Sequence, residues 1–255
     1  MFLKNAYPQR EFAEAAAAAL RAAQLPDGAE ILDLPCGDGT TTFWLAQNFP
    51  HSKVTGVDID PKKVGRAKSL FLPAIAFPPS ASLWRAKAKE GCHSSFVHLS
   101  NLHFAAADIF DWLRQTPRLD ALCLINSLFL LPDTDGLMRL IAEKMDDRSL
   151  FVCIIPNTAS RNFQNFQRLQ PQVNRLQISR EEIEPFFARY GLRAVSVQGI
   201  VFQHFYGLLW PKLLGPLRHW ALRRLHRRNS GRAGTEACYF LIVLRRNSAN
   251  APKPC

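Results

Sequence analysis

The chain has 255 residues, of which 47% are hydrophobic and 21% charged, and this composition excludes disordered and collagen-like proteins. Basic side chains outnumber acidic ones by 32 to 21, and the formal net charge of +11 favours an anionic partner, either a membrane surface or a nucleic acid. No apolar run is long enough to span a bilayer, and the first residues lack the apolar stretch of a secretory signal. Six scattered cysteines without a CxxC pair are typical of reduced thiols, so we expect a cytoplasmic protein.

Short apolar runs alternate with helical patterns along the chain. Helices are predicted at 9–24, 40–48, 61–70, 109–115, 133–145 and 179–190. Strands are predicted at 30–34, 53–58, 102–107, 120–126, 150–155, 192–201 and 237–244. Asp60 is the expected N-cap before Pro61, and Ser179-Arg-Glu-Glu182 has the pattern of a capping box. The alternation predicts an α/β fold in which helices cover both faces of a parallel sheet.

Three long segments interrupt the alternation, at 71–101, 156–178 and 201–235. The third belongs to a stretch, 185–235, that contains no acidic residue but nine lysines and arginines. Within it, 205–228 has apolar residues at helical spacing, tryptophans and many cations, which is typical of a helix that lies on an anionic membrane surface. A helical cover over the sheet edge and the substrate pocket explains the pattern as well, and binding to nucleic acid is the weaker alternative.

The sharpest motif is a glycine turn after the first predicted strand, in Ile31-Leu-Asp-Leu-Pro-Cys-Gly-Asp-Gly-Thr40. Gly37 and Gly39 allow the backbone to turn tightly and to approach a ligand with no Cβ in the way. Asp58 ends the second predicted strand, where a carboxylate can accept hydrogen bonds from both hydroxyls of a ribose. The pattern predicts a nucleoside-containing cofactor at the carboxyl ends of the strands. The structural alternative is a simple turn, with Asp58 capping the next helix.

The residues around the turn distinguish between nucleoside cofactors. A dinucleotide fingerprint has a third glycine, where this chain has Thr42. Asp33 and Asp38 flank the turn and would repel a pyrophosphate, but they suit a ligand that carries an ammonium and a sulfonium. The charges therefore favour S-adenosylmethionine and make a nicotinamide oxidoreductase the weakest of the alternatives.

At these motifs the chain resembles the class I S-adenosylmethionine-dependent methyltransferases. The family's first motif matches Asp33-Leu-Pro-Cys-Gly-Asp-Gly39, with Pro35 at the first glycine position. Asp58 matches the acid of the second strand, Asp108 the acid that closes the third, and Asp120-Ala-Leu-Cys-Leu-Ile-Asn-Ser127 the fourth-strand motif. The resemblance covers residues 25–160 and implies a Rossmann-like, seven-stranded, mostly parallel sheet whose last strand is antiparallel. It also implies methyl transfer from S-adenosylmethionine.

The resemblance implies a set of site residues on each side of the transferred methyl group. Those expected to bind the cofactor are Asp33, Pro35, Gly37, Gly39, Asp58, Asp108, Ile109 and Asn126. Those expected to border the acceptor are Ser127, Phe163, Tyr206 and Trp210. For Asp108 a helix N-cap is the competing interpretation, and for Asn126 and Ser127 a turn at the end of a strand. No residue is selected as a catalytic base, because the main contribution is alignment at a sulfonium that is already activated.

We expect one methyltransferase domain over 1–255, with an N-terminal helix at 9–24 and a basic, aromatic lid insertion at about 201–235. The acceptor is expected to enter over the strand ends, beneath a lid made from the segments 156–178 and 201–235. The leucines and aromatic residues of the lid suggest a small, apolar or amphiphilic acceptor, methylated on oxygen or nitrogen, at the inner face of a membrane. The alternatives are an RNA or tRNA methyltransferase and a non-catalytic binding protein of the same fold. His93, His98 and His103 lack the spacing of metal ligands, so we expect no metal site.

Overall fold

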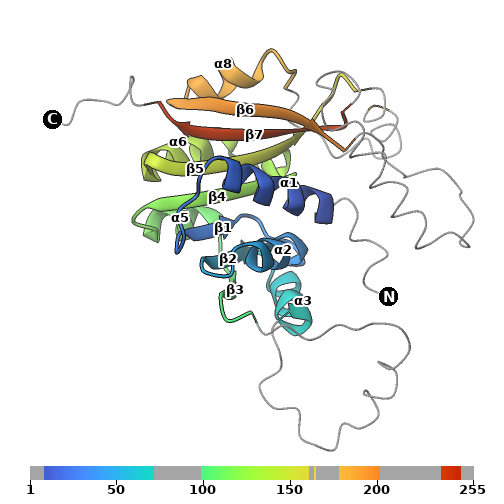
Figure 1. The fold of residues 1–255 in the computed structure, drawn as a ribbon, viewed down its shortest axis with the longest axis vertical. Helices are drawn as coiled ribbons and strands as arrows, with labels where there is room; N and C mark the ends of the chain where they lie inside the picture. Colours follow the sequence, from blue (N-terminus) through green and yellow to red (C-terminus); the bar gives the residue numbers. More distant parts are fainter. Residues whose placement is uncertain (1–8, 72–98, 161–163, 165–177, 202–236, 248–255) are drawn as a thin grey trace, which may run out of the picture.

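A seven-stranded sheet forms the centre of the computed structural model, which describes residues 9–71, 99–160, 164, 178–201 and 237–247 (Figure 1). Its strand order is β3-β2-β1-β4-β5-β7-β6. The strands are β1 (Glu30–Asp33), β2 (Lys53–Asp58), β3 (Leu102–Ala106), β4 (Leu119–Ile125), β5 (Met145–Pro156), β6 (Leu192–Ile200) and β7 (Tyr239–Arg246). All neighbouring pairs from β3 to β5 are parallel, and β7 runs antiparallel to both β5 and β6. The predicted fold class is confirmed, including the antiparallel last strand.

Helices cover both faces of this sheet. They are α1 (Gln9–Ala22), α2 (Thr40–Asn48), α3 (Pro61–Phe71), α5 (Ile109–Gln115), α6 (Thr134–Lys144) and α8 (Ile183–Ala188), with a short 3₁₀ helix η2 (Leu128–Leu130). The first three helices lie on the face turned toward the viewer in Figure 1, and the others pack against the opposite face. The chain order of strands and helices therefore produces a three-layer sandwich with one core on each side.

The two cores follow from the alternation of side chains along the buried strands. In β1, Ile31 joins the core beneath α1, α2 and α3, whereas Leu32 joins the core beneath α5, α6 and α8. In β5, every side chain from Ser149 to Pro156 is buried, because helices cover both faces of this strand. The burial also explains why the strands of the sequence are nearly continuous apolar runs.

Most elements differ from their predicted ends by only one or two residues, and the clearest differences concern β5, β7 and α8. β5 begins at Met145 instead of residue 150, because Leu119 of β4 already pairs with Met145. β7 is shifted to Tyr239–Arg246. The helix after Ser179 is shorter than expected, although one bond of the predicted capping box forms, from the Ser179 N–H to Glu182 Oε2 at 2.8 Å.

Several predictions concern residues outside the described ranges. Phe163, Tyr206 and Trp210, the helix at 205–228 and most of the lid at 201–235 belong to this group and remain predictions. The bases of the two predicted lid segments are described, and both lie at the carboxyl edge of the sheet. There Asn157 Nδ2 donates to the carbonyl oxygen of Ala237 at 2.8 Å, and the Cys238 N–H donates to that of Val201 at 2.7 Å. No helix in the described ranges is both long enough and apolar enough to cross a membrane.

Candidate functional site

The loop after β1 lies between the carboxyl ends of the neighbouring strands β2 and β4. The Leu34 N–H donates to the carbonyl oxygen of Cys123 at 3.0 Å, and the Cys36 N–H donates to that of Val57 at 2.8 Å. The peptide bond between Leu34 and Pro35 is cis, which the sequence analysis did not predict. Gly37 and Gly39 both have positive φ angles, 57° and 78°. The predicted glycine turn is therefore present, at the point where the strand order reverses and α/β proteins bind their ligands.

Asp58 at the end of β2 supports this loop from below. Its Oδ2 accepts a hydrogen bond from the Gly37 N–H at 2.8 Å, and its Oδ1 accepts one from the Asp60 N–H at 2.9 Å. The side chain is only 3% exposed. Each carboxylate oxygen has a second lone pair, so Asp58 can also accept hydrogen bonds from a ligand that lies over the loop. The position matches the predicted ribose acceptor and adds a structural role that the sequence did not indicate.

Asp33 at the end of β1 is buried beside Asp58 and bonded to the first turn of α2. Its Oδ2 accepts a hydrogen bond from Thr42 Oγ1 at 2.7 Å, and the side chain is 1% exposed. The pKa of Asp33 is raised to about 7, mainly because the side chain is buried; the Thr42 hydroxyl opposes this rise, and the negative charges of Asp58 and Asp38 add to it. Asp33 is thus only partly charged at neutral pH, whereas the sequence analysis treated it as a full negative charge that favours a cationic cofactor. A cation that approaches Asp33 would favour its charged form.

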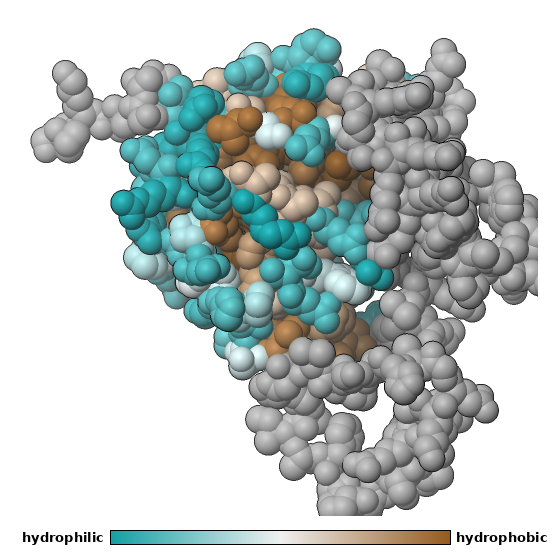
Figure 2. Space-filling view, in the orientation of Figure 1, coloured by the Kyte–Doolittle hydropathy of each residue, from teal (hydrophilic) through white to brown (hydrophobic). Residues whose placement is uncertain are grey.

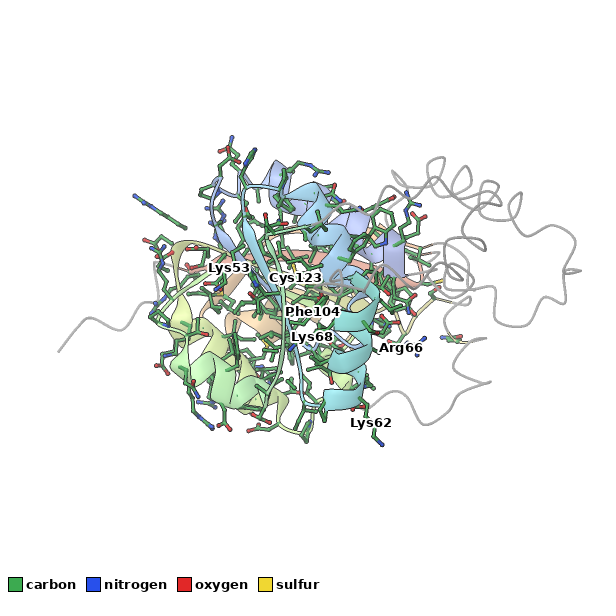
Figure 3. All side chains as sticks on the ribbon, turned by 90° about the horizontal axis from the view of Figure 1, so that it is seen from below. Lys53, Lys62, Arg66, Lys68, Phe104 and Cys123 are labelled. Carbon is green, nitrogen blue, oxygen red and sulfur yellow. The ribbon has the colours of Figure 1, made fainter. Side chains whose placement is uncertain are left out.

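Two glycines near the loop are required by close packing. A Cβ on Gly39 would lie 2.7 Å from the Cβ of Ala67 on α3 and 2.7 Å from the ring of Phe104 on β3 (Figure 3). A Cβ on Gly56 of β2 would lie 2.7 Å from Thr42 Oγ1. Gly37 differs, because nothing lies within 4 Å of the Cβ position on that residue. The space beside Gly37 is therefore open to a ligand.

The remaining acidic side chains at this edge cap helices. Asp38 Oδ1 accepts hydrogen bonds from the N–H and the hydroxyl of Thr40, and Asp60 Oδ1 accepts one from the Lys62 N–H at 2.9 Å. Asp108 Oδ1 accepts hydrogen bonds from the N–H groups of the first turn of α5. The cap interpretation of Asp108 is therefore correct, although its Oδ2 has no part in the cap. The side chain of Ile109 is buried in the core, which leaves its backbone as the part that can face a ligand.

Asn126 and Ser127 follow β4 and lie next to the β1 loop. Asn126 has a positive φ of 54°, and its Oδ1 is buried without a hydrogen-bond partner. The Ser127 hydroxyl is 3.5 Å from the carbonyl oxygen of Leu34, a marginal hydrogen bond, and its side chain is 4% exposed. A strained backbone and an unsatisfied acceptor both cost free energy, so their coincidence at this edge points to a ligand that supplies the missing donor.

Two residues that the sequence analysis did not assign belong to this site. The Thr42 hydroxyl donates a hydrogen bond to Asp33. The only signal in the sequence was that a threonine occupies the position of the third glycine of the dinucleotide fingerprint. Ile59 follows Asp58 and is 66% exposed, the most exposed large apolar side chain in the described ranges. The available signal in the sequence was an aliphatic residue directly after Asp58, the predicted ribose acceptor, because a purine base offers an apolar face to such a side chain.

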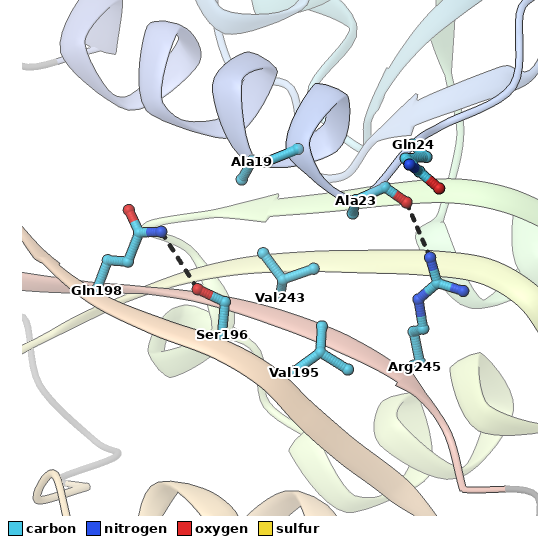
Figure 4. Close-up of a pocket in the computed structure, with 9 residues that line it drawn as sticks. Ala19, Ala23, Gln24, Val195, Ser196, Gln198, Val243 and Arg245 are labelled. Carbon is cyan, nitrogen blue, oxygen red and sulfur yellow. Dashed lines mark hydrogen bonds between the residues drawn. The ribbon is translucent and has the colours of Figure 1, made fainter.

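A groove lies at some distance from these residues, between the end of α1 and the β6–β7 pair (Figure 4). It is lined by Ala19, Ala22, Ala23, Gln24, Val195, Ser196, Gln198, Val243 and Arg245. Figure 2 faces this side and shows apolar surface over α1 and the β6–β7 pair. Arg245 Nη2 donates to the carbonyl oxygen of Ala23 at 2.8 Å, so this cation satisfies the last turn of α1. The groove contains none of the predicted site residues, and we assign it a structural role.

The residues at the carboxyl edge fit an adenosyl cofactor with a cationic amino-acid tail. The loop leaves open space beside Gly37, Asp58 and Asn126 provide hydrogen-bond acceptors, and Asp33 provides a carboxylate that a cation would hold in its charged form. The fold and the site together define an α/β protein that binds a nucleoside cofactor at its topological switch point.

A family model described as "Methyltransferase domain" matches residues 7–197 of the chain. The chain therefore belongs to the methyltransferase domain family, and it is an S-adenosylmethionine-dependent methyltransferase, as the resemblance implied. No curated protein sequence matches it.

Solved structures share the fold across nearly the whole chain. An S-adenosylmethionine-dependent methyltransferase from Archaeoglobus fulgidus is 16% identical, with 92% of this chain and 94% of that chain covered and a TM-score of 0.57. Magnesium protoporphyrin IX methyltransferase from Synechocystis PCC 6803, with bound S-adenosylhomocysteine, is 14% identical, with coverages of 93% and 83% and a TM-score of 0.54. The plantazolicin methyltransferase BamL, in complex with a triazolic desmethylPZN analogue and S-adenosylhomocysteine, is 14% identical, with coverages of 94% and 86% and a TM-score of 0.58.

Proposed function

We propose that the chain methylates an oxygen or nitrogen of a small, apolar or amphiphilic acceptor. The observation that carries the proposal is the unpaired, buried Oδ1 of Asn126, next to a glycine loop whose neighbouring strands end in buried acids. When bound, S-adenosylmethionine supplies an activated methyl group on a sulfonium. The protein contributes binding and alignment, which suffice for large rate enhancements when the reacting atoms are held in line.

Each part of the cofactor has a candidate partner among the described residues. Asp58 accepts from the ribose hydroxyls while it keeps its bonds to the loop, and Ile59 lies against the purine. Asn126 Oδ1 accepts from the ammonium group, and Asp33 faces the positive end of the cofactor from beneath the loop. Asp108, with one oxygen outside the helix cap, serves the amino group of adenine.

The position of the predicted lid segments supports the proposed class of acceptor, because both segments start at the edge of the sheet where the cofactor is proposed to bind. The bases of both segments, near Asn157 and Val201, are at the carboxyl edge. The sequence of the second segment, 201–235, is rich in leucine and aromatic residues. Ser127 and η2 follow β4 at the same edge, where Leu130 is 56% exposed. Apolar walls of this kind suit an apolar or amphiphilic acceptor.

Calorimetry with S-adenosylhomocysteine tests the cofactor assignment. We expect wild type to bind it and Asp58→Asn to bind it at least about thirtyfold more weakly, because one ribose acceptor becomes an amide donor. Asp60→Asn is the matched control, since asparagine caps a helix as well as aspartate does, and its affinity should equal that of wild type. Equal affinity in the Asp58 variant, with an unchanged fold, would remove Asp58 from the site.

A further inference from the structure

Helix α3 differs from the other described helices in the sign of its charges. It carries Lys62, Lys63, Arg66 and Lys68, all exposed, and no acidic residue. By contrast, α1, α5 and α6 each carry charges of both signs. The sequence analysis placed the excess positive charge in the last quarter of the chain, so this second basic surface became visible only when the helix and its exposed face were known.

The three lysines of α3 are exposed and available to an external partner. In the described part of the chain, Lys62, Lys63 and Lys68 form no ion pair, whereas Lys53 on the neighbouring strand β2 is bound to Glu30 at 2.7 Å. Only Val64 and Ala67 of α3 are buried, so the helix contacts the sheet along a narrow stripe. Lys62 and Arg66 point away from the sheet (Figure 3), and the small residues Gly65 and Ser69 lie exposed beside them. Within the part of the chain that the structure describes, this outer face is exposed and accessible to a flat, anionic surface.

We propose that the outer face of α3 docks the protein on an anionic lipid bilayer. The four positive charges of this helix match the clusters of lysine and arginine with which proteins recognise anionic headgroups. The docking face adjoins the proposed site, because α3 begins three residues after Asp58.

The composition of this face favours a bilayer over a nucleic acid. Single-stranded nucleic acids are held by cations together with aromatic side chains on which the bases stack. The outer face of α3 presents no such side chain, and Phe71 at its end is half-buried and stacked on Phe43 with 4.6 Å between ring centroids. The inference rests on the proposed function in one respect, since a bilayer is the natural source of an amphiphilic acceptor.

Co-sedimentation with vesicles tests the docking surface on the full chain. We expect wild type to bind phosphatidylcholine vesicles that contain phosphatidylserine, to bind less at high salt, and not to bind phosphatidylcholine alone. Lys62→Glu with Lys63→Glu should reduce binding at least about tenfold. Both substitutions place acids in the first turn of α3, where they favour the helix, so loss of folding is not expected.

The control is Arg148→Glu with Arg193→Glu, which changes the net charge equally at exposed positions near the amino ends of β5 and β6. It should bind vesicles as wild type does. An equal loss in both double variants, no loss in either, or a selective loss of single-stranded RNA binding in the α3 variant would overturn the proposal. Calorimetry with S-adenosylhomocysteine without vesicles, on the same proteins, separates this result from a failure of the proposed function.

Discussion

The hydroxyl of Thr42, in the first turn of α2, donates a 2.7 Å hydrogen bond to Oδ2 of Asp33 at the end of β1. Both side chains are buried, so this bond joins the first strand to the helix that follows the glycine loop. It also provides a donor to a carboxyl group that has lost its contact with water. The loop therefore has a rigid base and a titratable acid at the same place.

Replacement of Thr42 by valine should destabilise the protein by about 1–2 kcal/mol, because a buried acceptor loses its donor while the side-chain shape is kept. The loss should be larger at pH 8 than at pH 5, since the hydroxyl favours the charged form of Asp33. Urea denaturation at the two pH values measures it. Thr40→Val, which removes a more exposed bond to Asp38, should cost less than about 1 kcal/mol at both. Equal losses at the two pH values in the Thr42 variant would contradict the expectation.

The raised pKa of Asp33 predicts a specific pH dependence of stability. Its pKa is 3.8 in the unfolded chain and about 7 in the folded protein, so between these values the folded state binds more protons. The free energy of unfolding should therefore fall as the pH rises from about 4 to about 7, by up to about 1.4 kcal/mol per pH unit from this group. Asp33→Asn should lack this contribution, and its stability relative to wild type should increase up to about pH 7. Parallel curves for the two proteins would exclude the raised pKa.

Replacement of Asn126 should raise the stability of the protein and lower its affinity for the cofactor. Asn126→Gly relieves a positive φ of 54° and removes the unsatisfied Oδ1, so the free energy of unfolding should rise by about 0.5–1 kcal/mol. The same change removes the proposed acceptor for the cofactor's ammonium group, so affinity for S-adenosylhomocysteine should fall. Urea denaturation and calorimetry on the same samples give both quantities. A variant that is more stable and binds as tightly as wild type would show that Asn126 only forms a turn.

The glycines should respond to alanine according to their surroundings. Gly39→Ala should cost about 3 kcal/mol or more, because the new Cβ meets Ala67 and Phe104 at 2.7 Å and φ is positive. Gly65→Ala, on the exposed face of α3 with nothing within 4 Å, should instead stabilise by about 0.5–1 kcal/mol. Thermal and urea denaturation compare the two variants. If both variants changed the stability in the same direction, α3 would not approach the loop as closely as described.

Local patterns were enough to predict most of the fold. The alternation of apolar runs and helical patterns predicted the layers, because a strand covered on both faces must be apolar along its length. The turn between Gly37 and Gly39 was also visible locally, since few other residues adopt positive φ angles. The start of β5 was missed, because the residues at the amino end of this strand are partly exposed and not continuously apolar.

By itself, the sequence determined that this chain has acids and glycines at successive strand ends, and hence its class of cofactor. Only the tertiary structure decided what each acid does. Asp38, Asp60 and Asp108 cap helices, Asp58 holds the loop, and Asp33 is buried with a raised pKa. The unpaired Oδ1 of Asn126 and the cationic face of α3 were likewise recognised only in the tertiary structure. The burial, protonation state and hydrogen-bond partners of a side chain depend on neighbours that are distant in the sequence, so local sequence patterns cannot predict them.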